Sequence, residues 1–291
     1  MASMLDANIR IMLADTASLR TSGAIINLGS INGTGSDTAG IRLAGLDGTD
    51  AFAATGAENA DLGITSLTDG HVNVVVARYG LRRDISDLAT LTGFGGNDIN
   101  PARLAASMVG EYEACFMDLV ADAGEGASTD VGTSTVDMSV DDFYDAVFQL
   151  EISNAPGPYY ALLKPRQVAD LQESLRAEGG ALQYTAAAAD MLQAKGQGFV
   201  GSLLGVEIFK SDRVDASGGN VHGCMWGLGA FGYKTGTPVM PPGATVVSPN
   251  SEIVVEFQRN ASTATTEVVG HAYLGLSVLE QGRLVGIVTD E

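Results

Sequence analysis

Positive charge is scarce in this chain. Of its 291 residues, 16 are lysine or arginine and 35 are aspartate or glutamate, which gives a formal net charge of -19. A protein gains affinity for nucleic acid by placing cations on phosphates and releasing counterions. A chain with this balance is therefore a poor candidate for sequence-specific DNA binding, although lining a DNA-filled container is compatible with it. Like-charged copies also repel one another, so assembly would require buried apolar area or local charge pairing.

Cysteine and histidine are also few. Cys115 and Cys224 lie far apart in apolar surroundings and form no Cys-x-x-Cys pair, which favours two buried thiols in a reducing compartment. His71, His222 and His271 are widely separated, and none has a second histidine or cysteine at ligand spacing. The sequence predicts neither a metal site nor a cofactor.

Long apolar runs are missing. The longest candidate, Val268 to Leu279, is too short for a membrane span and contains His271 and two glycines. The first 13 residues carry Asp6 and Arg10 within their apolar pattern, which is not typical of a signal peptide. We expect a soluble protein that is made in a cytoplasm.

Catalytic motifs are lacking as well. Ser202 is not framed by the two glycines of a hydrolase nucleophile elbow. The segment Gly227 to Thr235 approaches a phosphate-binding loop, but Tyr233 stands before Lys234 and prolines follow where a helix is needed. No two carboxylates are spaced in a way that predicts an acid–base pair. The sequence therefore predicts a protein that is not an enzyme.

The clearest element present is a long amphipathic helix over residues 100–122. Asn100 suits the N-cap and Pro101 the first helical position. The apolar stripe would run for about 30 Å along one face, at 1.5 Å of rise per residue. Its predicted members are Leu104, Met108, Val109, Tyr112, Cys115, Phe116, Leu119 and Val120, with Glu111, Glu113 and Asp118 on the opposite face.

Residues 23–70 have a different composition, with ten glycines, six acidic residues, one arginine and one aromatic residue. Such a stretch buries too little apolar surface to offset its ordering entropy, so a flexible loop is one interpretation. However, Ile41 to Leu46 alternates apolar and other residues, and Val72 to Arg78 is rich in β-branched side chains. These flanks indicate an extended hairpin whose middle becomes ordered on something outside the chain.

The remaining pattern predicts an α+β protein with antiparallel sheet dominant towards the C-terminus. The last strands, with a tight turn at Gln281-Gly282, are expected to form one antiparallel set. Helices are predicted over 4–20, 141–151, 165–178 and 187–195, and strands over 159–163, 203–209, 221–226, 253–257, 265–276 and 284–289.

The order of these parts resembles the major capsid proteins of tailed phages, which have the Hong Kong 97-type fold. The likeness covers nearly the whole chain. The order of the predicted elements is more specific to the family than any single stretch of sequence. Local phrases that are similar to the family lie at Tyr160 to Pro165, Gly201 to Ser211, Phe257 to Asn260 and Gly282 to Val288.

The resemblance implies a division of the chain into the parts of that fold. Residues 1–30 would be the N-arm, and 31–79 the extended E-loop hairpin with its flanking strands. Residues 80–138 would form the peripheral domain with the spine helix at about 100–122, and 139–250 the axial domain. Residues 251–291 would be strands that return to the peripheral domain.

The resemblance also implies a function: a major capsid protein that self-assembles into hexamers and pentamers of an icosahedral shell around phage DNA. It implies a location in the virion and assembly in the host cytoplasm. The implied partners are sister copies, a portal protein and a possible decoration protein. No long scaffolding segment is visible, so a separate scaffolding protein is expected. The four lysines lie outside the loop, which argues against covalent cross-linking through it; they are Lys164, Lys195, Lys210 and Lys234.

An acidic loop laid over a neighbouring copy would need a basic landing site. The arginines at the base of the loop, or the cations that open the helix at residue 165, are the candidates; ordinary solvated charges are the equally weighted alternative. The residues that we predict to lie at inter-subunit contacts are Arg42, Asp47, Asp50, Phe52, Glu58, Asp61, Arg78, Arg82, Arg83, Lys164 and Arg166.

Three other interpretations remain open at this stage. An encapsulin-like compartment shell shares the fold but encloses cargo enzymes. An α+β hydrolase with an unrecognised site belongs to a different class and would form only a small oligomer. A surface adhesin suits the richness in glycine, serine and threonine but would need an export signal.

Overall fold

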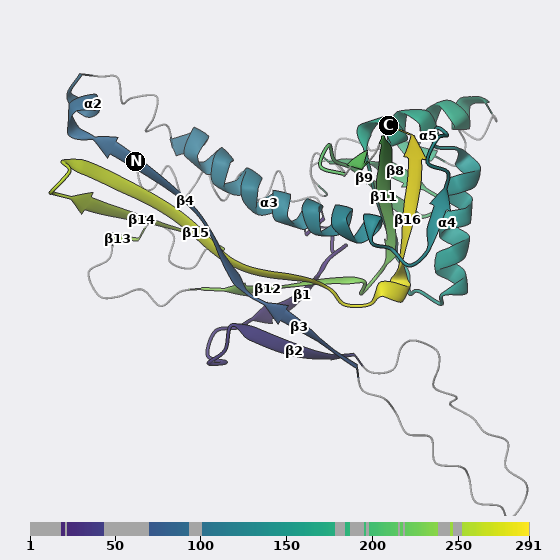
Figure 1. Cartoon of the computed structure of the whole chain (residues 1–291), viewed down its shortest axis with the longest axis horizontal. Coiled ribbons are helices and arrows are strands. Elements are labelled where there is room, and N and C mark those ends of the chain that lie inside the picture. The colour runs from purple at the N-terminus through teal and green to yellow at the C-terminus, as the bar shows by residue number, and fades with distance from the viewer. Residues whose placement is uncertain are drawn as a thin grey trace, which may run out of the picture.

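The described residues form two large β-sheets connected by one long helix, and a third sheet of two strands, β2 and β3 (Figure 1). The structure is a computed structural model. It describes residues 19–20, 22–43, 70–92, 101–177, 184–186, 195, 198–214, 216–217, 219–237, 245–246 and 252–290.

The first sheet, which we call the arm sheet, extends to the left in Figure 1 and is organised by β15. The first part of β15 pairs with β14 and with β4, and its last part pairs with β12, all antiparallel. The edge strand β1 pairs with β12 in parallel. The strands are β1 (Ile26–Ser30), β4 (Ala77–Ser86), β12 (Phe231–Gly236), β13 (Thr245–Val246), β14 (Ile253–Asn260) and β15 (Thr265–Val278).

The second sheet, the body sheet, has the order β5-β16-β11-β6-β9-β8-β7, with β10 beside β11. Two of its pairings are parallel, β16 with β5 and β6 with β9. Its strands are β5 (Asp130–Gly132), β6 (Tyr159–Leu163), β7 (Tyr184–Ala186), β8 (Phe199–Leu203), β9 (Val206–Lys210), β10 (Ala216–Ser217), β11 (Asn220–Gly227) and β16 (Leu284–Asp290).

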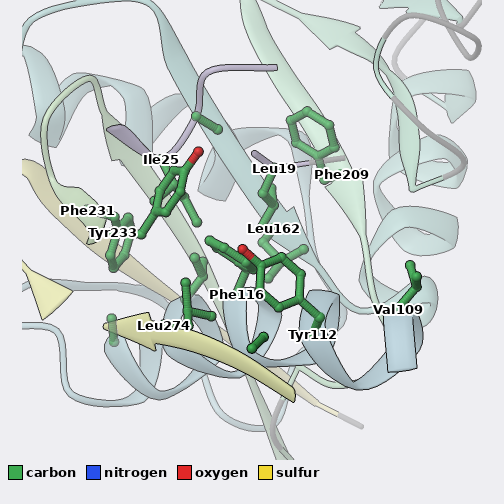
Figure 2. Close-up of a cluster of buried hydrophobic side chains, with 14 of the residues drawn as sticks. Leu19, Ile25, Val109, Tyr112, Phe116, Leu162, Phe209, Phe231, Tyr233 and Leu274 are labelled. Carbon is green, nitrogen blue, oxygen red and sulfur yellow. The ribbon is translucent and has the colours of Figure 1, made fainter. Parts of the chain in front are cut away.

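Helix α3 (Pro101–Glu125) confirms the predicted long helix and ends three residues later than expected. Its buried stripe packs against both sheets. The Phe116 ring lies edge-on to Tyr233 of β12 at 5.2 Å between centroids, in the same core as Leu162 of β6 and Leu274 of β15 (Figure 2). One continuous core therefore fixes the arm sheet relative to the body sheet. Glu113 is a correction: it was expected on the solvent face but is only 7% exposed.

Helices α4 (Val140–Ile152) and α5 (Pro165–Ala177) cover the face of the body sheet opposite to α3, and both confirm predicted helices. The two cores divide β6 by alternation, because Leu162 joins the α3 side whereas Ala161 and Leu163 join the α4–α5 side. A capping box starts α4: the Ser139 hydroxyl accepts a hydrogen bond from the Asp142 amide, and the Asp142 carboxylate accepts one from the Ser139 amide.

Two strand predictions need correction. The single strand expected over 203–209 is a hairpin of β8 and β9, because Leu204 and Gly205 turn the chain at positive φ, 55° and 80°. The final strand, expected to extend the antiparallel set of β14 and β15, is β16 of the body sheet, where it pairs with β11. The short 3₁₀ turn η3 (Gln281–Arg283) carries the chain from one sheet to the other and closes no hairpin.

Several expectations fall largely outside the described residues. The helix predicted over 4–20 and the helix predicted over 187–195 are in this position, apart from Leu19, Arg20 and Lys195. The middle of the predicted hairpin, 44–69, is also outside.

Candidate inter-subunit surface

The strands that flank the glycine-rich stretch pair with each other. Strand β2 (Thr38–Leu43) is antiparallel to β3 (Gly70–Val75), with Thr38 opposite Val75 and Leu43 opposite Gly70. The amide of Val76 donates to the carbonyl of Asp37 at 2.9 Å and closes the base of this stem. The pairing that was inferred from the two flanks is thus confirmed, and the stem projects from the lower edge of the arm sheet (Figure 1).

Strand β4 continues directly from this stem, with Val76 alone between β3 and β4. It pairs with β15 over its whole length, from Ala77 opposite Leu274 to Ser86 opposite Thr265. The second edge of β4 carries no strand among the described residues. Strand β4 is ten residues long, and a strand edge that no other strand covers is the usual place for strand addition by another chain.

The three arginines that were predicted as a landing site all lie on β4. Arg78 and Arg82 line one open hollow of about 470 Å³, whose floor includes Gly80 and Val269. Arg83 lies opposite Val268 of β15, one position further along the strand. The three cations therefore share a single strand directly beside the hairpin stem, with Arg78 and Arg82 on one face of the sheet and Arg83, by the alternation of side chains, on the other. We call the outer edge of β4 with these arginines the β4 surface.

Arg82 is already paired within its own chain. Its Nε lies 2.9 Å from Asp84 Oδ1, and its Nη2 lies 3.0 Å from Glu267 Oε1. The guanidinium side chain is 58% exposed, so these pairs are screened by solvent and contribute little to stability. Among the described residues, no carboxylate lies within 4 Å of Arg78 or Arg83, and these two cations remain open to a partner.

The other predicted contact residues lie elsewhere. Arg166 stands at the start of α5, on the body sheet, where it pairs with Asp170 at 3.2 Å and with Asp137 at 3.6 Å. The structure thus separates Lys164 and Arg166 from the β4 surface. Arg42 is in β2, within the stem. The remaining predicted members, Asp47, Asp50, Phe52, Glu58 and Asp61, fall outside the described residues.

A second hollow, not predicted from the sequence, lies between β4 and α3. It measures about 360 Å³, and Tyr79, Met108 and Gly270 are among its lining residues. Gly270 allows close approach of the helix, since a Cβ at this position would overlap the thioether end of Met108. The two hollows lie on either side of β4, so this strand is accessible from both.

The described residues offer little for catalysis. They contain no group of three or more histidine, cysteine, aspartate or glutamate side chains that could hold a metal ion. Cys224 is buried, and burial raises the pKa of its thiol well above the ordinary value. The phosphate-loop-like stretch forms a turn followed by β12, and no helix follows it in the described residues. None of the described helices combines the length and hydrophobicity needed to cross a bilayer.

Comparison with solved structures identifies the fold. The capsid of Ralstonia phage GP4 matches with a TM-score of 0.62 at 11% sequence identity, over 95% of this chain and 91% of that chain. The capsid of cyanophage P-SCSP1u matches with a TM-score of 0.59 at 14% identity, over 95% and 89%. The holo-SrpI encapsulin complex from Synechococcus elongatus PCC 7942 matches with a TM-score of 0.58 at 14% identity, over 88% and 82%.

These matches define the fold class: the chain has the fold of phage capsid proteins, which an encapsulin shares. The resemblance seen in the order of sequence elements is confirmed at the level of the fold. No family model and no curated protein matches the sequence.

Proposed function

We propose that this chain is the major capsid protein of a tailed phage, a structural subunit that self-assembles into hexamers and pentamers of an icosahedral shell around the DNA genome. The observation that carries the proposal is the β2–β3 stem, which projects from the arm sheet and is followed directly by β4 with its three arginines. The match to capsid structures over nearly the full length of the chain supports it.

In this proposal the hairpin of one copy lies over the β4 surface of a neighbour. The stretch beyond the stem, residues 44–69, contains five carboxylates and no lysine or arginine. The β4 surface offers Arg78 and Arg83 without carboxylate partners among the described residues, which is the complementary charge. Each contact is weak, but repetition over a closed shell makes the sum large.

We assign the domains of the proposed capsid fold according to the two large sheets. We assign the arm sheet and α3, the proposed spine helix, to the peripheral domain. The body sheet with α4 and α5 is the proposed axial domain, and it includes β16, the last strand of the chain. The N-arm would comprise residues 1–30 and the E-loop hairpin residues 31–79. A scaffolding protein, a portal protein and a decoration protein are the proposed partners during assembly in the host cytoplasm.

An encapsulin-like compartment is the second candidate, and the match to the SrpI complex favours it. The two functions differ in what the shell encloses. Nucleic acid in purified particles supports a capsid, whereas a co-purifying enzyme in particles free of nucleic acid supports a compartment. Neighbouring genes offer an independent check, because terminase and portal genes accompany a capsid gene.

Electron microscopy of the purified protein tests the proposal directly. A shell subunit is expected to give closed particles of uniform size and megadalton mass. An α+β hydrolase would instead give a small oligomer by light scattering. A protein that remains monomeric at high concentration, with the scaffolding partner supplied, would contradict the proposed function.

A further inference from the structure

The described residues that directly precede β1 are built into the core of the molecule. Leu19 and Ile25 are at most 2% exposed and lie in the core that α3 shares with both large sheets (Figure 2). The carbonyl of Ala24 accepts a hydrogen bond from the indole of Trp226, on β11, at 3.0 Å. We call the described residues within 19–25 the N-terminal strap. The strap cannot leave the molecule without opening part of this core.

The strap carries one charged side chain into these apolar surroundings. Arg20 lies 2.6 Å from Glu252, in the residues before β14, and 3.6 Å from Glu113 of α3. The Glu113 residue is 7% exposed, and neither of its carboxylate oxygens accepts a hydrogen bond among the described residues. The other titratable groups that act on Arg20 are two phenols, Tyr112 of α3 and Tyr233 of β12. The described part of this cluster therefore has a single cation for its two carboxylates.

Ionisation of Glu113 is costly while the strap is closed. A carboxylate that is buried without hydrogen bonds loses its hydration, and the guanidinium that it shares with Glu252 compensates only part of this loss. Burial accordingly raises the pKa of the Glu113 carboxyl from the ordinary value of 4.5 to about 7, against the attraction of Arg20. Opening of the strap takes Arg20 away and admits water, so Glu113 regains its ordinary pKa. The closed strap thus holds a proton that the open strap releases, and opening becomes more favourable as the pH rises from about 4.5 through about 7.

We propose that the N-terminal strap is a pH-sensitive closure of the core, held shut while Glu113 is protonated and released more readily when Glu113 is ionised. The inference goes beyond the proposed function, because the closure belongs to the single subunit and needs no neighbouring copy. Release would uncover three groups together, the carboxylates of Glu113 and Glu252 and the indole of Trp226.

Cleavage by trypsin after Arg20 measures the opening of the strap, because the protease must take up a side chain that the closed strap holds against Glu252. At pH 8, Glu113→Gln should slow this cleavage by about tenfold or more, since glutamine cannot ionise. Cleavage after Arg176, which is exposed near the end of α5, corrects for the activity of the protease. Glu111→Gln, at an exposed position of α3, is the matched control and should be cleaved like the parent. Equal cleavage of Glu113→Gln and the parent would overturn the inference, as would an equal slowing in the control.

Hydrogen exchange of the Trp226 indole provides a second measurement. Trp226 is the single tryptophan of the chain, so its indole N–H gives one assignable signal. After correction for the intrinsic pH dependence of exchange, its rate should rise about tenfold between pH 6 and pH 8 in the parent and stay constant in Glu113→Gln. The amide of Leu162, in the core strand β6, should exchange more slowly at both pH values. A corrected indole rate that does not change with pH in the parent would overturn the inference. Equal corrected rates for the indole and the Leu162 amide would also overturn it, because the opening would then be global unfolding.

Discussion

Arg20 donates from Nη1 to both carboxylate oxygens of Glu252, at 2.8 and 2.6 Å, and ties the first described residues of the chain to the beginning of β14. Tyr112 donates to the same carboxylate at 3.1 Å. Glu113 lies 3.6 Å from Arg20 Nη2, and neither of its oxygens accepts a hydrogen bond among the described residues. One cation thus faces two carboxylates in a largely buried site. Burial, with a smaller contribution from Glu252 and against the attraction of Arg20, raises the pKa of the Glu113 carboxyl to about 7.

This site predicts a pH dependence of stability. The carboxyl has its ordinary pKa of 4.5 in the unfolded chain and a pKa of about 7 in the folded protein. The folded state holds the proton more tightly, so the stability of the parent falls as the pH rises from about 4.5 through about 7. Glu113→Gln removes this loss and should raise the free energy of unfolding at pH 8 by on the order of 2–3 kcal/mol.

Urea denaturation at pH 4.5 and at pH 8 checks the prediction, because the difference between variant and parent should be near zero at the lower pH. Glu111→Gln, on the exposed side of the same helix, is the matched control and should leave both values unchanged. If Glu113→Gln and the parent have the same free energy of unfolding at both pH values, the carboxyl of Glu113 titrates normally and the prediction is wrong.

Charge reversal on the β4 surface tests the landing site. Arg82→Glu with Arg83→Glu should impair shell assembly, because two of the three cations of the proposed landing site would become negative and would repel the acidic hairpin. The monomer is expected to remain folded, since both side chains are exposed. Arg83→Glu alone spares the Arg82–Glu267 pair and should show part of the same defect. The yield of particles by light scattering is the measurement; normal particles from the double variant would eliminate the landing site.

Shortening the hairpin tests its role independently. Leu43 and Gly70 are paired across the stem, so Asn-Gly in place of residues 44–69 can close it as a two-residue turn. The shortened chain should keep the Tm of the parent monomer and form no shells. Wild-type particles from this variant would mean that residues 44–69 are dispensable for assembly.

The body sheet is expected to be sensitive to any side chain at the position of Gly132. Its φ is 91°, and a Cβ there would overlap the carbonyl oxygen of Val288 on β16. Gly132→Ala should therefore lower the free energy of unfolding by about 2 kcal/mol or more, since backbone must move. Gly110→Ala is the opposite case, because Gly110 is exposed within α3 with open space around it. It should stabilise the protein by about 0.5–1 kcal/mol, and thermal denaturation compares the two.

The sequence predicted the elements whose signal is local. The stripe of α3 with Pro101 at its start, the helix α4 and the buried strand β6 each follow from the spacing of apolar residues or from a proline position within a few residues. The β2–β3 pairing was predicted from two strand-like segments that flank a glycine-rich, acidic stretch. The arginines of β4 were predicted as a group because they lie close together in the sequence at the base of the hairpin.

The rest depended on contacts that are distant in sequence. Glu113 adjoins Tyr112 at the edge of the helical stripe, and only the position of Arg20, brought there by the N-terminal segment, explains its burial. No local pattern assigns β16 to the body sheet, because its short apolar run suits either sheet. The turn at Leu204 was missed because leucine at positive φ is uncommon.

The position of β16 also has a consequence for how the protein is made. This strand lies between β5 and β11, more than 150 residues after the former. A ribosome must release residue 290 before the gap can be filled, and until then β5 and β11 have no common neighbour. We therefore expect the body sheet to close only after translation of this region ends, while the nascent chain still exposes the unpaired edges of both strands.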